Sequence, residues 1–221
     1  MPQGVTLMTQ ILKLHPTHPQ PRLIRLAAET LRSGGVIAYP TDSSYALGCR
    51  IGDAAAARRI RQMRGVDARH HLTLICRDLA HVGRFARMDN RQFRILRRGT
   101  PGTFTFLLRA TPEVPRRVQH PKRSTIGVRV PDHAIVRALL NALDEPILSS
   151  TLILAGDTQP LNDAQTIAAR LGGRIEAIID SGPCPALPST VIDLETSPPT
   201  VVRPGLGDPA SLGLESEEAG A

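Results

Sequence analysis

Hydrogen-bonding side chains cluster directly after an apolar run near the start of the chain. Residues 39–48, YPTDSSYALG, contain five of them in succession, namely Thr41, Asp42, Ser43, Ser44 and Tyr45. A strand that ends in such a loop presents polar groups at the edge of a sheet, where open α/β sheets commonly bind ligands. An ordinary polar turn has a similar composition, so this segment indicates a ligand site only in combination with others.

Arginines at two other places could hold an anion. Arg61 and Arg64 are three residues apart on a predicted helix, and their shared face could stabilise the charge on an attacked phosphate. Arg129 alternates with Thr125 and Gly127 on one face of a predicted strand, where a guanidinium is costly to bury without an anionic partner. The alternatives are a solvated helix face for Arg58, Arg59 and Arg61 and a structural salt bridge to an aspartate for Arg129.

Hydroxyl groups also occur inside late apolar segments, at Ser149 to Thr151 and at Ser189 with Thr190, while Arg203 follows two valines. Hydroxyls in such strands are unusual in a core and typical of a polar lining. The chain has no GxSxG, HExxH, P-loop or GxGxxG sequence, so we name no catalytic nucleophile. Any reaction at a phosphate would then depend on positioning and on cationic stabilisation of charge.

A metal site is not predicted from the histidines. His70 and His71 are adjacent, but no further Asp, Glu or Cys ligands accompany them at a metal-binding spacing. The three cysteines are far apart and form no CxxC pair, which argues against a zinc knuckle and a disulfide framework and favours a reducing compartment.

Positive charge is concentrated in the middle of the chain. Residues 50–137 hold 20 of the 27 Lys and Arg residues but only 6 of the 20 Asp and Glu residues. Of the basic residues, 25 are arginines, whose planar guanidinium pairs well with phosphates and carboxylates. This pattern predicts a surface for phosphate from a nucleotide or from RNA. Solvated helix faces that happen to be rich in arginine are the alternative, above all for residues 84–98.

The chain of 221 residues can form one large domain or two small ones. No apolar run approaches the roughly 18 residues of a membrane span, and the first residues lack the features of a signal peptide. We therefore expect a cytoplasmic protein without membrane contact. The sequence leaves its oligomeric state open.

Helices and strands are mixed along the chain without an internal repeat or a long linker. We predict strands at 36–39, 72–76, 104–109, 126–130, 146–153, 175–179, 190–194 and 200–203. Helices are expected at 21–32 and, after the capping residues Asp53, Asp78, Asp89, Asp132 and Asp163, in five further segments. This mixture predicts a single α/β domain over residues 1–208 with a mixed sheet. Residues 209–221 are expected to form an acidic, disordered tail.

Taken together and in order, these segments resemble the YrdC/YciO family, the threonylcarbamoyl-AMP synthases that begin threonylcarbamoyladenosine formation on tRNA. The matching stretches are GGVIAYPTDSSYALGC, TPGTFTFLLRAT, TIGVRVPDHAI, PILSST, PSTVIDL and VVRPGLGD, which together extend over nearly the whole chain. The phrases PTDSSYALGC, LTLICRDL, EVPRR and PILSST resemble the YciO branch in particular.

The resemblance implies a twisted mixed sheet of about seven strands, flanked by helices, around a large basic cavity. It also implies a reaction in which threonine, bicarbonate and ATP, with Mg²⁺, form threonylcarbamoyl-AMP and pyrophosphate. Hydrolysis of threonylcarbamoyl-AMP is the variant reaction we consider. The cavity of this family is also associated with double-stranded RNA or tRNA.

Site residues follow from the resemblance position by position. It implies threonine binding by Thr41, Ser43, Arg129, Ser149 and Ser189, and nucleotide binding by Arg64, Thr125, Thr151 and Arg203. Three positions depart from the family pattern: Gln62 replaces a lysine, Ile153 an asparagine and Ile75 a histidine. These changes remove a positive charge and a polar ligand. The residues that would bind the substrates are therefore retained better than those that would activate ATP.

Because of these departures, the alternative function is RNA binding. The chain would then be a non-catalytic paralogue that binds double-stranded RNA or tRNA. Aromatic residues make up only 3% of the chain and tryptophan is absent, so RNA would be recognised through backbone and shape. A scaffold without a ligand is the remaining alternative, and it would leave the polar side chains at the strand ends unexplained.

Overall fold

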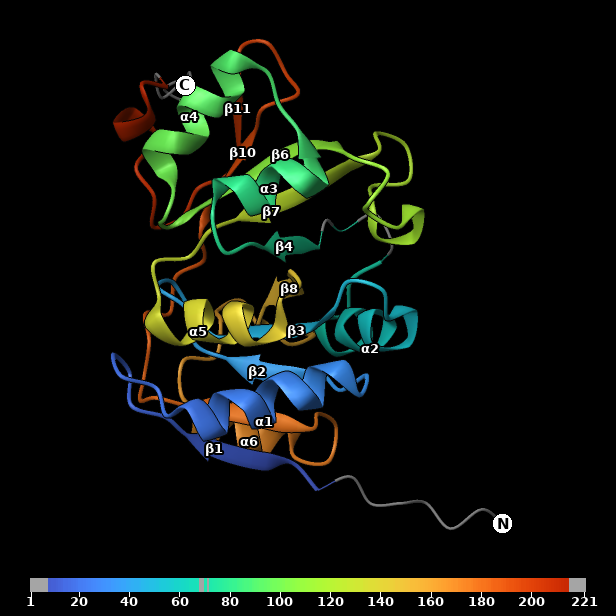
Figure 1. Ribbon diagram of the computed structural model, residues 1–221, viewed down its shortest axis with the longest axis vertical. Coiled ribbons are helices and arrows are strands. Elements are labelled where there is room, and N and C mark those ends of the chain that lie inside the picture. The colour runs from blue at the N-terminus through green and yellow to red at the C-terminus, as the bar shows by residue number, and fades with distance from the viewer. Residues whose placement is uncertain (1–7, 68–69, 71, 215–221) are drawn as a thin grey trace.

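One mixed sheet organises the chain (Figure 1). In the computed structural model, which describes residues 8–67, 70 and 72–214, the sheet has 11 strands in the order β1-β9-β2-β3-β8-β4-β7-β6-β10-β11, with β5 paired to β6. The strands are β1 (Gln10–Lys13), β2 (Ile37–Tyr39), β3 (Ala46–Arg50), β4 (Thr73–Ile75), β5 (Ala86–Arg87), β6 (Phe104–Ala110), β7 (Thr125–Arg129), β8 (Ile147–Thr151), β9 (Ala177–Asp180), β10 (Thr190–Asp193) and β11 (Thr200–Arg203). The expected mixed α/β fold is confirmed, but the expected count of about seven strands is too low.

The additional strands are short or lie where turn residues dominate. β5 has two residues, β1 is a four-residue edge strand, and β3 follows the polar loop so closely that its residues resemble a continuation of that loop. β3 forms because antiparallel pairing with both β2 and β8 provides hydrogen bonds that the local sequence does not indicate.

The helices begin where the sequence places their caps, with one exception. They are α1 (Pro21–Arg32), α2 (Ala54–Arg64), α3 (Leu79–Phe85), α4 (Asn90–Gly99), α5 (Ala134–Leu143) and α6 (Ala164–Leu171). The side chains of Asp53, Asp78, Asp89 and Asp163 accept hydrogen bonds from backbone N–H groups in the first turns of α2, α3, α4 and α6. The prediction that Asp132 caps α5 is wrong. The N-cap is His133, and the Asp132 N–H donates to Asp42 Oδ2 (3.0 Å).

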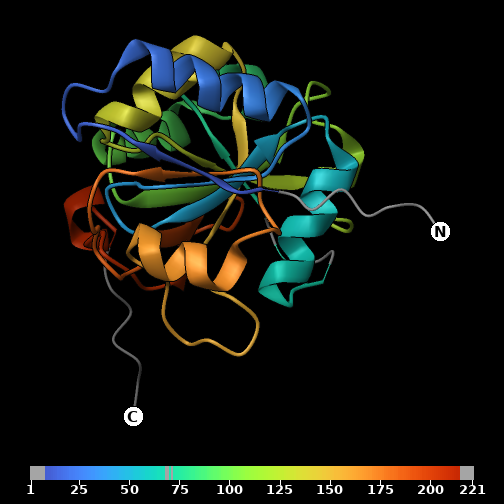
Figure 2. The same ribbon diagram turned by 90° about the horizontal axis from the view of Figure 1, so that it is seen from below.

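Two layers of helices cover the sheet. Figure 2 shows α1 and α5 on one side of it and α2 and α6 on the other. The first layer buries Ile24 and Leu31 of α1 and Ile135 and Leu139 of α5 against Ile37, Tyr39, Ile75 and Ile147 of the strands. The second layer, which α3 and α4 extend, packs on the opposite strand faces through Leu47, Leu74, Phe106, Val128 and Leu148. No helix in the described part of the chain is both long and apolar enough to cross a membrane.

Alternation along the strands places most cavity residues on the face opposite to the core of the second layer. Along β8, Leu148 lies in the core of the second layer, whereas Ser149 lies on the face that Ile147 shares with α1 and α5. Along β6, Phe104 and Phe106 lie in that same core, whereas Thr105 between them lines a cavity. The cavity therefore lies mainly on the face that Thr105 and Ser149 share, where it adjoins the α1–α5 layer.

The segment after β11 returns to the sheet and ends in a short 3₁₀ helix, η2 (Pro209–Leu212). Leu212 is buried, and its carbonyl accepts a hydrogen bond from Arg98 of α4 (3.2 Å). Residues 209–214 are therefore ordered, in contrast to the predicted disordered tail, because the buried side chain of Leu212 anchors them. Residues 215–221 lie outside the described part of the chain.

Close approach of this returning segment to β10 requires glycine. The Leu206 N–H donates to the Pro188 carbonyl (3.0 Å), and a Cβ atom on Gly205 would lie 2.3 Å from that carbonyl oxygen. Real Cβ atoms do not approach an oxygen so closely, so any side chain at position 205 must push the segment away from residues 188–189.

We expect the Gly205→Ala substitution to lower the free energy of unfolding by about 1–3 kcal/mol, as overpacking does. At about 2–4 °C per kcal/mol for a chain of this size, thermal denaturation followed by circular dichroism measures the loss. Gly83→Ala is the matched control, because Gly83 lies in α3 with open space at its Cβ position. That change should stabilise the protein by about 0.5–1 kcal/mol. An unchanged melting temperature for Gly205→Ala would refute the packing argument.

Candidate functional site

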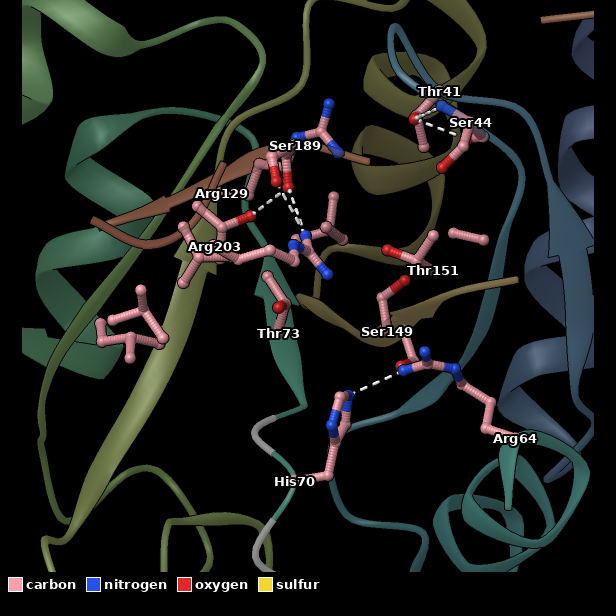
Figure 3. A pocket seen from close by; sticks show the side chains of 17 residues that line it. Thr41, Ser44, Arg64, His70, Thr73, Arg129, Ser149, Thr151, Ser189 and Arg203 are labelled. Atoms are coloured by element: carbon pink, nitrogen blue, oxygen red, sulfur yellow. Dashed lines mark hydrogen bonds between the residues drawn. The ribbon is translucent and has the colours of Figure 1, made fainter. Parts of the chain in front are cut away.

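A cavity of about 250 Å³ lies mainly on the face of the sheet that Thr105 and Ser149 share. Side chains from β3, β4, β6, β7, β8, β10, β11 and α2 line it together with the loop before β3 (Figure 3). Seven of the nine residues predicted to bind ligand line this cavity: Thr41, Arg64, Arg129, Ser149, Thr151, Ser189 and Arg203. Segments that are far apart in sequence therefore meet at one place.

Arg129 at the end of β7 combines two of the roles considered for it. Its Nη2 forms an ion pair with Asp42, its Nη1 donates to Ser43 Oγ (2.9 Å), and its Nε donates to the Gly102 carbonyl (3.3 Å). The structural salt bridge is therefore present. Arg129 also lines the cavity, and each terminal nitrogen carries a second hydrogen. Burial lowers the pKa of the Arg129 guanidinium, and the charge of Asp42 opposes this shift.

Arg203 and Ser189 lie side by side in the cavity. Arg203 Nη2 donates to the Ser189 carbonyl (2.8 Å) and, more weakly, to Ser189 Oγ (3.4 Å). The Ser189 hydroxyl also contacts Thr105 Oγ1 at 2.7 Å. Arg203 Nε is buried and has no hydrogen-bond partner within the described residues. The Arg203 guanidinium is thus held through Nη2 by the backbone carbonyl of Ser189, and its remaining N–H groups are available to a ligand.

Arg64, at the end of α2, reaches the cavity from the other end, next to His70 (Figure 3). Its Nη1 donates to Ser150 Oγ (2.6 Å) and contacts His70 Nε2 (2.7 Å), while Nε donates to the Ile153 carbonyl (3.3 Å). Because an arginine nitrogen only donates, the contact with His70 requires the unprotonated Nε2 of a neutral imidazole.

The positive charges of Arg64 and Arg203 are not paired with carboxylates among the described residues. Among the residues that the structure describes, neither Arg64 nor Arg203 forms an ion pair, and no Asp or Glu lines the cavity. Burial, together with the charge of Arg203, lowers the pKa of Arg64 to about 10. Burial and the charge of Arg129 likewise lower the pKa of Arg203. An anionic ligand would relieve both the repulsion and the desolvation, so the electrostatics favour an anion.

Two of the predicted site residues are not among the lining residues. Ser43 is buried behind Arg129 and accepts its hydrogen bond, so it orients the guanidinium. Thr125 is buried at the start of β7, at the opposite end of the strand from Arg129. A direct nucleotide contact by Thr125 therefore has no support from this geometry.

The structure also places residues in the cavity that the sequence analysis did not assign to a ligand. They are Ser44, Ala46, His70, Thr73, Ile75, Thr105, Leu107, Ser150, Val191 and Val202. Strand alternation could have identified Thr73 and Thr105, because their neighbours in sequence are core residues. Of the departures from the family pattern, Gln62 is exposed on α2, Ile75 lines the cavity, and Ile153 contributes its carbonyl to Arg64.

No group of three or more His, Cys, Asp or Glu side chains that could hold a metal ion occurs among residues 8–67, 70 and 72–214. The cavity thus offers guanidinium and hydroxyl groups rather than a preformed set of metal ligands. Hard cations such as Mg²⁺ bind mainly to oxygen ligands, above all to carboxylates, substrate phosphates and water.

Comparisons with known proteins show which family and fold this chain resembles. A family model named for Sua5, YciO and YrdC, and described as "Telomere recombination", matches residues 29–205. The YciO protein of Escherichia coli K12 is 48% identical over 201 residues, which cover 91% of this chain and 98% of YciO. The E. coli YciO crystal structure has a TM-score of 0.90 and 47% identity, covering 93% of this chain and all of that one.

Similarity extends to proteins with a named activity. A threonylcarbamoyl-AMP synthase of Chromobacterium violaceum is 35% identical over 193 residues, which cover 82% of this chain and 93% of the synthase. The crystal structure of Pyrococcus abyssi Sua5 complexed with L-threonine has a TM-score of 0.82 and 31% identity. That match covers 89% of this chain and 58% of Sua5.

Removal of the Asp42 carboxylate should destabilise the fold, because it leaves the buried charge of Arg129 without a partner. For Asp42→Ala we expect the free energy of unfolding to fall by about 3–5 kcal/mol, measured by urea denaturation. The matched control is Asp157→Ala, which breaks the more exposed pair with Arg170 and should cost about 0–1 kcal/mol. Equal effects of the two substitutions would show that Asp42 does not neutralise Arg129 in the folded protein.

Proposed function

The chain belongs to the Sua5/YciO/YrdC family, and from this premise we propose that its cavity binds threonine and ATP and forms threonylcarbamoyl-AMP. The observation that carries the proposal is the convergence of Arg64, Arg129 and Arg203 on one cavity that no carboxylate lines within the described residues. Such a site suits a substrate pair that brings one carboxylate and a chain of phosphates.

Each arginine has a separate role in this proposal. Arg129 holds the threonine carboxylate through the second hydrogens of its terminal nitrogens, while Asp42 and Ser43 fix the plane of its guanidinium. Arg203 and Arg64 bind the phosphates of ATP and supply the positive charge that the triphosphate requires. The lowered pKa of Arg64, about 10, is still well above 7, so Arg64 stays charged at neutral pH.

The chemistry needs no nucleophile from the protein. The nitrogen of threonine bonds to the carbon of bicarbonate, a C–O bond of the bicarbonate breaks and water leaves. One oxygen of the resulting carbamate then attacks the α-phosphorus of ATP. A bond forms between this oxygen and phosphorus, the bond from the α-phosphorus to its bridging oxygen breaks, and pyrophosphate leaves with the electron pair. The protein contributes alignment of the two reactants and stabilisation of charge on the phosphate oxygens.

Magnesium would enter with the nucleotide. Because no carboxylate lines the cavity in the described part of the chain, we propose that the ion is held by ATP phosphate oxygens and water. The hydroxyl groups that line the cavity, among them those of Ser150 and Thr151, would be available to that hydration shell.

The departures from the family pattern predict a slow synthesis. Gln62 supplies no charge where the family has a lysine, and the side chain of Ile153 offers no hydrogen bond where it has an asparagine. Binding of the finished adenylate depends less on these groups than attack on ATP does. Hydrolysis of threonylcarbamoyl-AMP is therefore the second activity that we include in the proposal.

An activity assay tests the proposal directly. Purified protein with L-threonine, bicarbonate, ATP and Mg²⁺ should produce threonylcarbamoyl-AMP, detected by liquid chromatography with mass spectrometry, and should slowly hydrolyse added threonylcarbamoyl-AMP. Arg203→Met keeps the aliphatic stem but removes the charge, and we expect a loss of about 10²-fold or more in turnover, typical of a lost electrostatic contact.

The matched control is Arg58→Met, which removes one charge from the exposed side of α2 and should leave turnover unchanged. Melting temperatures establish that both variants fold. Absence of synthesis and of hydrolysis by the folded wild-type protein would reject the enzymatic proposal.

RNA is the second partner that we propose, on the basis of a separate surface. Arg91, Arg94 and Arg97 are exposed at intervals of three residues on α4, and none of them forms an ion pair within the described residues. We expect binding to double-stranded RNA or tRNA whose affinity falls by about 10³-fold or more between 50 and 200 mM salt if six or more phosphates are contacted.

Fluorescence anisotropy measures this salt dependence. A triple substitution of the three α4 arginines by glutamine should weaken binding and flatten the slope, whereas Arg22→Gln with Arg25→Gln on α1 should not. Affinity that does not change with salt would rule out recognition through the phosphate backbone.

A further inference from the structure

The hydroxyl of Tyr39 is joined to the cavity through Ser149. Tyr39 ends β2 and Ser149 lies on β8, with β3 between the two strands. The Tyr39 hydroxyl lies 2.6 Å from Ser149 Oγ, and Tyr39 itself is fully buried and does not line the cavity. We propose that Tyr39 is a positioning residue that makes Ser149 a hydrogen-bond acceptor toward the cavity, so that this position selects a ligand N–H group. The ligand class named here rests on the proposed function.

Local packing fixes this arrangement. The Tyr39 ring lies over Gly48 of β3, where an added Cβ atom would be 2.7 Å from the ring atom Cε1. Gly48 is the residue that pairs with Ser149 across β3 and β8. The absence of a side chain at position 48 therefore lets the ring cross β3 and bring its hydroxyl to Ser149.

The direction of the hydrogen bonds follows from their partners. Ser149 Oγ donates to the Leu47 carbonyl (3.0 Å), which can only accept. A serine hydroxyl has one hydrogen, so the hydrogen between Tyr39 and Ser149 must come from Tyr39. Burial raises the pKa of the Tyr39 phenol, which keeps that hydrogen in place at physiological pH. The chain of donation thus runs from Tyr39 to Ser149 to Leu47.

The consequence for a ligand is a fixed polarity. One lone pair of Ser149 Oγ accepts from Tyr39, and its only hydrogen is directed to Leu47, so the second lone pair is what Ser149 offers to the cavity. Thr41 has the same restriction, because its hydroxyl donates to the Ser44 carbonyl (2.7 Å). Anionic oxygens can therefore bind the guanidinium groups, whereas Ser149 favours a donor such as the nitrogen of an amino acid or of its carbamoyl derivative.

A purely structural role is the competing explanation. The bond between Tyr39 and Ser149 also ties β2 to β8, so its loss could lower stability without any effect on ligand choice. Tyr45 provides the matched control, since it is equally buried and its hydroxyl bonds the Gly182 carbonyl (3.2 Å) rather than a cavity residue. These are the two tyrosines of the chain.

Neutron diffraction from crystals grown in D₂O tests the polarity without any ligand. We expect a deuteron on the Tyr39 oxygen directed at Ser149 Oγ and the Ser149 deuteron directed at the Leu47 carbonyl. A Ser149 deuteron that points into the cavity would overturn the proposal.

Ligand selectivity tests the consequence. Calorimetry would compare L-threonine with (R)-3-hydroxybutyrate, which keeps the carboxylate and the hydroxyl but lacks the amine. We expect the wild-type protein and Tyr45→Phe to prefer threonine by at least about tenfold. Ser149→Ala removes the acceptor and should lose most of this preference. Tyr39→Phe removes the donor that holds Ser149 Oγ in place, so its hydroxyl is free to rotate toward the cavity, and the preference should fall as well. The affinity of both variants for 3-hydroxybutyrate should stay the same.

The outcomes separate the two ideas. If Tyr39→Phe lowers the melting temperature but leaves the preference for threonine intact, the role of Tyr39 is structural and the proposal is wrong. If the wild-type protein binds neither compound, the proposed function and the ligand class fail together, whereas the deuteron positions still decide the role of Tyr39.

Discussion

Partial burial of guanidinium groups without enough carboxylates is the constraint on which this site depends. Removing a charge from water costs several kcal/mol even after relaxation, and like charges that face each other add to that cost. Asp42 neutralises Arg129, but Arg64 and Arg203 have only hydroxyl, carbonyl and imidazole partners among the described residues. The two apolar cores stabilise the fold enough to offset this cost. The positive electrostatic potential of the cavity then favours the binding of an anion.

The register of the strand pairing brings segments that are distant in sequence together in one site. β4 lies between β7 and β8, so Thr73 is paired with both Gly127 and Ser149, and Ile75 is paired with Arg129. On the other side of β7, β6 carries Thr105 to the hydroxyl of Ser189. Five segments that are far apart in sequence thus present side chains to the same space, and the register of the strands determines where each functional group lies.

Much of this was predictable from local patterns. Apolar runs predicted most strands, and capping aspartates predicted the starts of four helices. Alternation along β7 predicted that Arg129 and Gly127 share a strand face. β3 and the start of α5 were missed because pairing with β8 and the contact between Asp42 and the Asp132 N–H are long-range effects. For the same reason no local signal showed that Tyr39 meets Ser149, since their contact depends on which strands become neighbours.

Alternation along the strands has an evolutionary consequence. Along β4 and β6, the cavity residues Thr73, Ile75, Thr105 and Leu107 alternate with core residues that face the second helical layer. Substitutions at the cavity positions therefore leave the packing of the core positions in place. Selection can alter ligand preference in one lineage while the scaffold persists, which is how a family with one architecture can diversify in the molecules it recognises.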